Sequence, residues 1–252
     1  MATFNAAYQG EWIKLISRRK YIVFFVLGLT ICVGWALLGH AAAQWLGHYS
    51  GLWVNLVPTP IGALPFFLRV LMPLIIFMAT TDLITTEANQ GSIKASLYRP
   101  ITRWKLYGAK LLAILTYVMV YLMAVFMALS FVSFLFASRF TFGDVTLAWA
   151  AYLLSVPPLA VLIAFAGLVA LFSRSSTLVM FLLMAIYGML YIIPLIFPVL
   201  FQALFTSYLG WHRFWIGIIP SPWRLVHMTV VLASYGVAFF MAGSLLFDRQ
   251  EY

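Results

Sequence analysis

The side chains most able to do chemistry gather in one polar stretch, TTEANQGSIKASLYRPITRWKLYGAK, which runs from Thr85 to Lys110. It stands between two long apolar runs, in a chain that is 65% hydrophobic and 8% charged. One carboxylate, on Glu87, accompanies basic side chains on Lys94, Arg99, Arg103, Lys105 and Lys110. A carboxylate and cations at this density pair with one another or bind a partner of complementary charge. The stretch is therefore the first candidate functional site.

No other pattern in the sequence predicts catalysis or a bound cofactor. The phosphate-binding loop G-x-x-x-x-G-K-[ST] and the hydrolase motifs H-E-x-x-H and G-x-S-x-G are missing. The chain has four histidines, which are His40, His48, His212 and His227. Imidazoles could bind a metal, but none of the four has another histidine at i,i+4 spacing or an acid or cysteine beside it. We expect no enzyme activity, and no catalytic, cofactor-binding or metal-binding residue in this chain.

Membrane-spanning helices must position the polar stretch. The mean hydropathy of the 252 residues is +1.03, and runs of about 20 apolar residues are long enough to cross a ~30 Å hydrocarbon core as helices. We predict an all-α integral membrane protein with a single transmembrane domain over residues 1–252. Its six spans are expected at about 21–39, 62–84, 106–137, 146–172, 177–200 and 226–247.

The basic residues predict the orientation of the spans. If both ends of the chain are cytoplasmic, eleven Lys and Arg side chains fall on the cytoplasmic side and four on the other, as the positive-inside rule requires; the four are Arg69, Arg139, Arg213 and Arg224. Because the bases flank spans, the net charge of +9 indicates topology and no nucleic-acid partner. We expect a multi-pass protein of the cell membrane, in contact with lipid, with both termini and residues 85–104 cytoplasmic.

Two further segments are predicted to lie at the membrane surface. Residues 1–20 are expected to form an interfacial helix, with Glu11 and Lys14 paired at i,i+3 and an apolar face of Phe4, Tyr8, Trp12 and Leu15 turned toward the membrane. The alternative is a disordered basic leader. Residues 201–225 are rich in aromatic side chains, which settle at the headgroup level, and should form short re-entrant helices on the outer side.

Two of the apolar runs are expected to be irregular. A helix from Thr102 to Ser138 would measure ~55 Å, so its first turns, with Arg103, Lys105 and Lys110, are expected to project into the cytoplasm. The adjacent Pro157 and Pro158 predict a kink in the fourth run, because proline lacks the backbone donor that a helix needs.

The local pattern of the polar stretch predicts a short helix held between two spans. Gly91 ends the second span, and Pro100 ends the short helix that follows. Ile93 and Leu97 share the face on which it rests, and the other side presents Lys94, Tyr98 and Arg99. Such a segment is either a basic loop that orients two spans or a docking element for a cytoplasmic subunit.

The stretch resembles the cytoplasmic segment of ABC type-2 exporter permeases. In that family a Glu ends the second span, Gly follows four residues later, and a short coupling helix leads into the third span. The matching positions here are, in order, Glu87, Gly91, Leu97, Pro100, Arg103 and Lys110. The N-terminal amphipathic helix, the six spans and the outer re-entrant segment before the sixth span also fit the family.

The resemblance implies a permease subunit of an ATP-driven exporter. Such a subunit pairs with a second copy or a related permease and binds separate cytoplasmic ABC ATPase subunits, which carry ATP and Mg2+. The coupling helix would transmit ATP-driven closure to the spans. The expected cargo is an amphipathic compound, with a peptide antibiotic or a drug as the first choice.

An ion-gradient-driven carrier or channel without an ATPase remains the alternative. Carriers bury ionisable groups near the midplane of the membrane, whereas Arg69 and Asp82 both lie off-centre in the second run. Arg69 either lines an outward cavity that meets an anionic group or snorkels to the outer headgroups, and we favour snorkelling. Asp82 is expected to pair with nearby cations. Arg69, Pro157 and Pro158 are the residues assigned to a translocation path.

Overall fold

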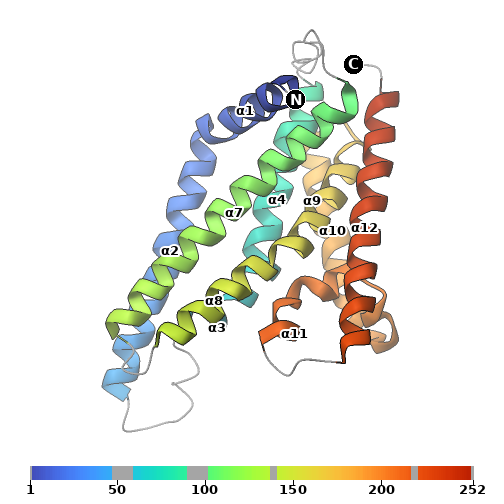
Figure 1. Cartoon of the computed structure of the whole chain (residues 1–252). Helices are drawn as coiled ribbons and strands as arrows, with labels where there is room; N and C mark the ends of the chain where they lie inside the picture. Colours follow the sequence, from blue (N-terminus) through green and yellow to red (C-terminus); the bar gives the residue numbers. More distant parts are fainter. Residues whose placement is uncertain (1, 47–58, 90–101, 137–140, 217–220, 251–252) are drawn as a thin grey trace.

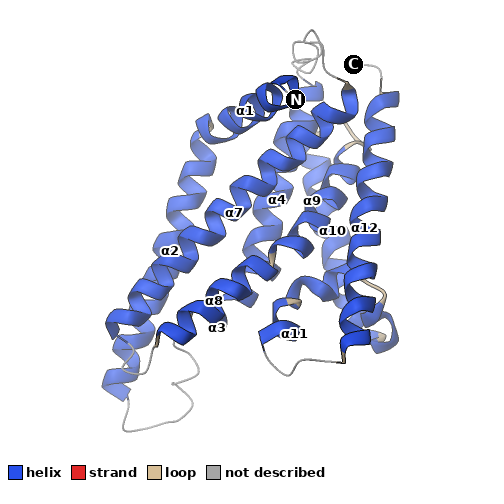
Figure 2. Cartoon of the chain, viewed as in Figure 1, coloured by secondary structure: helices blue, strands red, loops and turns tan. Residues whose placement is uncertain are grey.

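The computed structural model describes residues 2–46, 59–89, 102–136, 141–216 and 221–250 (Figure 1). The described chain is helical, with short loops and no strand (Figure 2). Six segments are long and apolar enough to cross a membrane, which confirms the predicted class and the number of spans.

The six spans begin and end within a few residues of the predicted boundaries, apart from longer ends on some helices. They are α2 (Arg19–Leu46), the continuous segment Pro60–Asn89, α7 (Arg103–Phe136), α8 with α9 (Phe142–Leu154 and Val156–Ala170), α10 (Ser176–Ile196) and α12 (Pro222–Arg249). The N-terminal helix α1 (Ala2–Ser17), the start of α7 and the last turn of α12 lie at the same end of the bundle, called the α1 end below (Figure 1).

The long helix α7 contacts most of the other helices and runs diagonally across the bundle (Figure 1). Its tyrosines pack against glycines of neighbouring helices, where a larger side chain would clash. A Cβ at Gly28 in α2 would overlap the Tyr121 hydroxyl, and one at Gly243 in α12 would overlap that of Tyr107. Small residues at helix contacts let backbones approach closely, which favours packing of membrane helices.

The second span is interrupted by two π turns. Its parts are α3 (Pro60–Phe66), the π turn η2 (Phe67–Leu71), α4 (Met72–Thr80), the π turn η3 (Thr81–Thr86) and α5 (Glu87–Asn89). Pro73 has no N–H, so the carbonyl oxygen of Arg69, four residues earlier, lacks its ordinary helical donor. The Tyr187 hydroxyl of α10 donates to that oxygen at 2.8 Å. Each π turn carries one charged side chain of the span, Arg69 or Asp82.

The predicted break in the fourth span is confirmed. Helix α8 ends at Leu154 and α9 starts at Val156, directly before the two prolines, with Ser155 between them. The buried Ser155 hydroxyl donates to the Ala151 carbonyl oxygen at 2.8 Å, and that oxygen also accepts from the Ser155 backbone N–H at 3.1 Å, so Ser155 is held to the last turn of α8.

Short helices precede the sixth span, as predicted. They are the 3-10 turns η4 (Pro198–Gln202) and η5 (Phe205–Gly210) and the helix α11 (His212–Ile216). Segment η5 packs on α9, and α11 packs on α8, at the end of the bundle opposite α1 (Figure 1). This end is called the α11 end below.

The N-terminal helix α1 (Ala2–Ser17) bends at Arg18 into α2 and packs across the first turns of α7. The face that was expected to lie on the membrane instead contacts protein: Leu15 is fully buried, and Phe4, Tyr8 and Trp12 are partly buried against the core. The Tyr8 hydroxyl donates to Thr116 Oγ1 of α7 at 2.9 Å. The start of α7 therefore does not project freely, because α1 covers it.

Candidate functional site

Four charged side chains form a closed ring at the α1 end, called the charge ring below. Lys110 Nζ lies 2.9 Å from Glu11 Oε2 and 2.5 Å from Glu87 Oε2. Lys14 Nζ lies 2.9 Å from Glu11 Oε1 and 3.1 Å from Glu87 Oε1. Each carboxylate thus accepts from both ammonium groups, one at each oxygen, and the ring joins α1, α5 and α7.

Pairing explains how these charges can be buried. The Lys110 side chain is 0% exposed and those of the two glutamates are 3% and 4% exposed, whereas Lys14 is 38% exposed. A buried charge is tolerated only when it is paired and hydrogen-bonded, and this ring is neutral in sum, with two acids and two bases. Removal of Lys110 or of either glutamate would leave an unmatched charge in a closed space, whereas the Lys14 ammonium lies where solvent has access.

The neighbouring charges of the ring shift the pKa values of Glu11 and Lys14, the acid and the base that α1 contributes. Burial raises the pKa of the Glu11 carboxyl, but the Lys110 and Lys14 ammonium groups outweigh it and lower the pKa below its ordinary value. Burial lowers the pKa of Lys14, but Glu11 and Glu87 outweigh it and raise that pKa. Both groups are therefore held in their charged forms.

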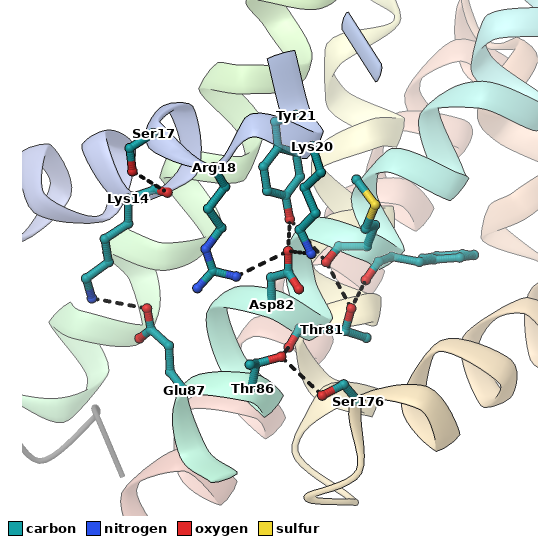
Figure 3. A network of polar contacts seen from close by, with 12 residues as sticks. Lys14, Ser17, Arg18, Lys20, Tyr21, Thr81, Asp82, Thr86, Glu87 and Ser176 are labelled. Carbon is teal, nitrogen blue, oxygen red and sulfur yellow. Dashed lines mark hydrogen bonds and ion pairs between the residues drawn. The ribbon is translucent and has the colours of Figure 1, made fainter. Parts of the chain in front are cut away.

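A second ionic cluster fixes the bend between α1 and α2 (Figure 3). Its acceptor is Asp82 in η3, which pairs with Lys20, lies 3.3 Å from Arg18 Nη1 and accepts from the Tyr21 hydroxyl at 2.5 Å. The Tyr117 hydroxyl of α7 donates to the Tyr21 carbonyl oxygen at 2.9 Å. The expectation that Asp82 pairs with nearby cations is confirmed.

Hydrogen bonds continue these contacts to the other helices of the α1 end. Thr86 Oγ1 lies 3.1 Å from Ser176 Oγ, at the start of α10 (Figure 3). Arg103, the first residue of α7, donates to the carbonyl oxygens of Asp248 and Gln250 at 2.6 and 3.1 Å. Gln250 Nε2 in turn donates to the Leu171 carbonyl oxygen at 2.6 Å. The last turn of α12 is thereby tied to the start of α7.

Of the predicted coupling residues, Glu87 and Arg103 lie in the described part of the chain. Glu87 contacts Lys14 and Lys110, and Arg103 contacts α12, so these two residues are attached to different helices. The remaining predicted residues lie outside the described residues: Gly91, Ile93, Lys94, Leu97, Tyr98, Arg99 and Pro100.

Sequence reasoning missed the burial of Glu11 and Lys110. The predicted i,i+3 pair of Glu11 with Lys14 is confirmed at 2.9 Å, but both carboxylate oxygens of Glu11 face inward. Lys110 was expected on the projecting part of the third helix and is instead fully buried. One signal could have found it, namely a lysine two turns inside a helix whose other residues are almost all apolar.

Arg69 lies near the α11 end and lines a cavity, as in the alternative that was not favoured, while snorkelling of its side chain to the headgroups stays a prediction. The cavity has a volume of about 140 Å3 and is also lined by Tyr191 and Phe201. The guanidinium carbon lies 6.0 Å from the centre of the Tyr191 ring. Pro157 and Pro158, predicted with Arg69 to form a translocation path, do not line this cavity.

Nothing in the described ranges brings three metal-ligating side chains together. His212 is buried, with Nδ1 3.5 Å from the Ser155 hydroxyl. Burial, and then the Arg213 and Arg69 charges, lower the pKa of His212 to about 4.

Comparison with known proteins places these features in one family. Residues 6–220 match the family described as ABC-2 family transporter protein. No curated protein matches the chain. The matched region includes the charge ring, the second ionic cluster and both ends of the segment 90–101. Because the match covers most of the chain, the chain belongs to the ABC-2 family of membrane transporters and is a permease.

Proposed function

We propose that this permease is the membrane subunit of an ATP-driven exporter, and that residues 85–104 receive the movement of a separate ABC ATPase. The observation that carries the proposal is the charge ring, together with the contact of Arg103 with α12. Glu87 precedes the segment 90–101 and Arg103 follows it. Each of them is attached to a different part of the bundle, so a force on the segment reaches several spans.

The attachments favour transmission over simple tethering of a loop. A shift of Glu87 acts on α1 and α7 through Lys14 and Lys110, and a shift of Arg103 acts on α12. Buried ion pairs are costly to separate, so the joined helix ends move together or adopt a second paired arrangement. Elements with two discrete arrangements are the means by which a small local shift becomes a rearrangement of helices.

The proposal includes a second permease copy, or a related permease, and two ATPase subunits that bind ATP and Mg2+. Helices α2, α10 and α12 bury few residues in the single chain, and these apolar faces are available to lipid and to the second permease. The proposed cargo is an amphipathic compound, such as a peptide antibiotic or a drug. A gradient-driven carrier is less favoured because the ion pairs among the described residues lie at the α1 end, away from the middle of the spans.

The test is co-purification with the candidate ATPase in mild detergent, followed by transport and ATPase measurements in lipid vesicles. Glu87→Ala and Gly91→Val should still insert, because no apolar residue of a span is changed, but both should reduce cargo-stimulated ATPase activity at least about tenfold, since a buried pair is lost in one case and the predicted turn would be strained in the other. The matched control is Asp144→Ala, which removes a carboxylate that caps α8. Parent-like stimulation and assembly in both variants would exclude the coupling role.

Topology is tested separately with single cysteines. In a Cys32→Ser background, an impermeant thiol reagent applied to intact cells should label Ser50→Cys and spare Ser96→Cys. The opposite labelling pattern would reverse the proposed orientation, with both termini and residues 85–104 cytoplasmic.

A further inference from the structure

Two arginine side chains converge on one small region at the α11 end. Arg69 extends from the π turn η2, and Arg213 extends from α11. A Cβ at Gly210, at the end of η5, would lie 3.6 Å from Arg69 Nη2 and 4.0 Å from Arg213 Cδ. Two segments more than 140 positions apart in the sequence thus bring arginine side chains to the same backbone position. Arg69 approaches it with its guanidinium, and Arg213, which lies outside the lining of the Arg69 cavity, approaches it with the methylene that carries its guanidinium.

Among the described residues, no acid is placed to neutralise these cations. The sequence has six acids: Glu11, Asp82, Glu87, Asp144, Asp248 and Glu251. The first three and Asp248 lie at the α1 end, and Glu251 lies outside the described residues. Asp144 caps α8, where its Oδ2 accepts from the Thr141 backbone N–H and hydroxyl, each at 2.8 Å. Two like charges without a carboxylate repel each other unless an anion lies between them.

The cavity beside Arg69 is small and offers one further free donor, because the Thr206 hydroxyl already donates to the Leu190 carbonyl oxygen at 3.0 Å. Its polar lining residues besides Arg69 are Thr206 and Ser207, and its apolar lining consists of Leu190, Tyr191, Pro194 and Phe201. The Ser207 hydroxyl is buried and has no hydrogen-bond partner among the described residues. A volume of about 140 Å3 is below the roughly 300 Å3 of the smallest sites for drug-sized ligands. An oxyanion fits, and a large molecule would have to leave its body outside.

We propose that Arg69, Arg213 and Ser207 form a binding site for a phosphate-type oxyanion. Arginine suits this role because its planar fork donates two parallel hydrogen bonds to oxyanions and stays charged at any physiological pH. The aromatic and aliphatic lining favours an anion that is carried on an apolar body, as in an anionic lipid or an acidic amphipathic cargo. The site stands apart from the coupling role proposed above, since its test needs no ATPase.

The experiment measures binding to the purified, delipidated permease in an uncharged detergent. One arm adds phosphatidylglycerol, with diacylglycerol as the neutral control, and counts retained lipid by native mass spectrometry. The other adds inorganic phosphate, with chloride as the control, and follows the thermal unfolding temperature. We expect Arg69→Gln and Arg213→Gln each to weaken the binding roughly tenfold or more, the effect of losing a hydrogen bond to a charged group.

Controls separate the site from general positive charge and from unfolding. Arg224→Gln removes another exposed arginine, in the first turn of α12, and should bind like the parent. Arg213 is exposed, so its replacement leaves the packing intact, and Arg69→Lys keeps a charge if Arg69→Gln proves unstable. If binding of the lipid depends on the two arginines, the ligand of the site is the head group of an amphipathic molecule. If only binding of inorganic phosphate depends on them, the ligand is the free ion. Binding of neither probe, or equal binding by the parent and Arg213→Gln, would overturn the proposal.

Discussion

Replacing Lys110 with methionine gives the sharpest prediction for the charge ring. Methionine fills a similar length of the buried space, but Glu11 and Glu87 then share the single remaining ammonium of Lys14. At an effective dielectric constant of 20, contacts of 2.5 and 2.9 Å each represent about 6 kcal/mol of gross Coulomb attraction. Desolvation of the lysine offsets much of this, and breaking a buried pair typically costs about 3–5 kcal/mol. For a chain of this size, the thermal unfolding temperature should fall by roughly 10 °C.

Intrinsic tryptophan fluorescence on heating in a mild detergent is the assay, and Lys14→Met is the matched control. Lys14 contacts the same two carboxylates at similar distances but is 38% exposed. Ion pairs that reach solvent contribute about 1 kcal/mol or less, so this variant should unfold within about 4 °C of the parent. The difference in unfolding temperature between Lys110→Met and Lys14→Met therefore measures the effect of burial, because both variants lose one charge.

The pH dependence provides a second readout with a defined sign. In the parent the pKa of Glu11 is lowered, so its contribution to stability is lost as pH falls through that pKa. Without Lys110, burial should prevail and raise the pKa of Glu11. The folded variant then takes up a proton more readily than the unfolded chain, so lowering the pH from 8 to 5 should reduce the difference in unfolding temperature between Lys110→Met and the parent. Equal unfolding temperatures for the parent and both variants, at every pH, would refute the ring as a structural element.

Three further predictions concern other contacts. Gly28→Ala should lower the unfolding temperature by several degrees, whereas Gly34→Ala, at a position that faces open space, should not. Adding Tyr121→Phe to Gly28→Ala removes the overlapping hydroxyl and should restore most of the lost unfolding temperature. A failure to restore it would contradict the assigned clash. Arg103→Gln should speed amide hydrogen exchange in the last turn of α12, because two hydrogen bonds to its end are lost, and unchanged protection there would count against that attachment. The pKa of His212 is lowered to about 4, so the folded chain binds fewer protons than the unfolded chain, and stability should fall as pH drops from about 6.5 to about 4. His212→Gln should flatten this dependence of stability on pH. An unaltered dependence would show that another group is responsible.

The features that the sequence predicts well are those written in neighbouring residues. Apolar length fixes the six spans, because a helix needs about 20 such residues to cross a bilayer. The adjacent Pro157 and Pro158 fix the break between α8 and α9, because the missing donors act within one turn. Glu11 and Lys14 pair because i,i+3 positions are neighbours on a helix.

Contacts between distant segments could not be predicted in the same way. Lys110 and Glu11 are separated by 99 positions, and the pattern around Lys110 does not indicate that α1 will cover it. The aromatic stripe of α1 suits a lipid surface and a protein surface equally, because both are apolar. Arg69 approaches Gly210 only because η5 folds back against the bundle, an arrangement that the aromatic composition of 201–225 implies without specifying its neighbours.

The two π turns of the second span also have a consequence for its tolerance of insertions and deletions. A π turn holds one residue more than the α-helical turn that it replaces, so deletion of one residue within η2 would restore regular α-helix. All preceding residues of the span would then rotate by about 100° and shift by about 1.5 Å relative to those that follow. Trimming η2 would therefore turn α3 away from its present contacts with α7 and α8, while Asp82 kept its partners. Trimming η3 would instead displace Glu87 from the two lysines that bind it. Single-residue deletions in these two turns would therefore change the helix contacts at one end of the molecule at a time. A point substitution within regular helix does not rotate one part of a span relative to the other.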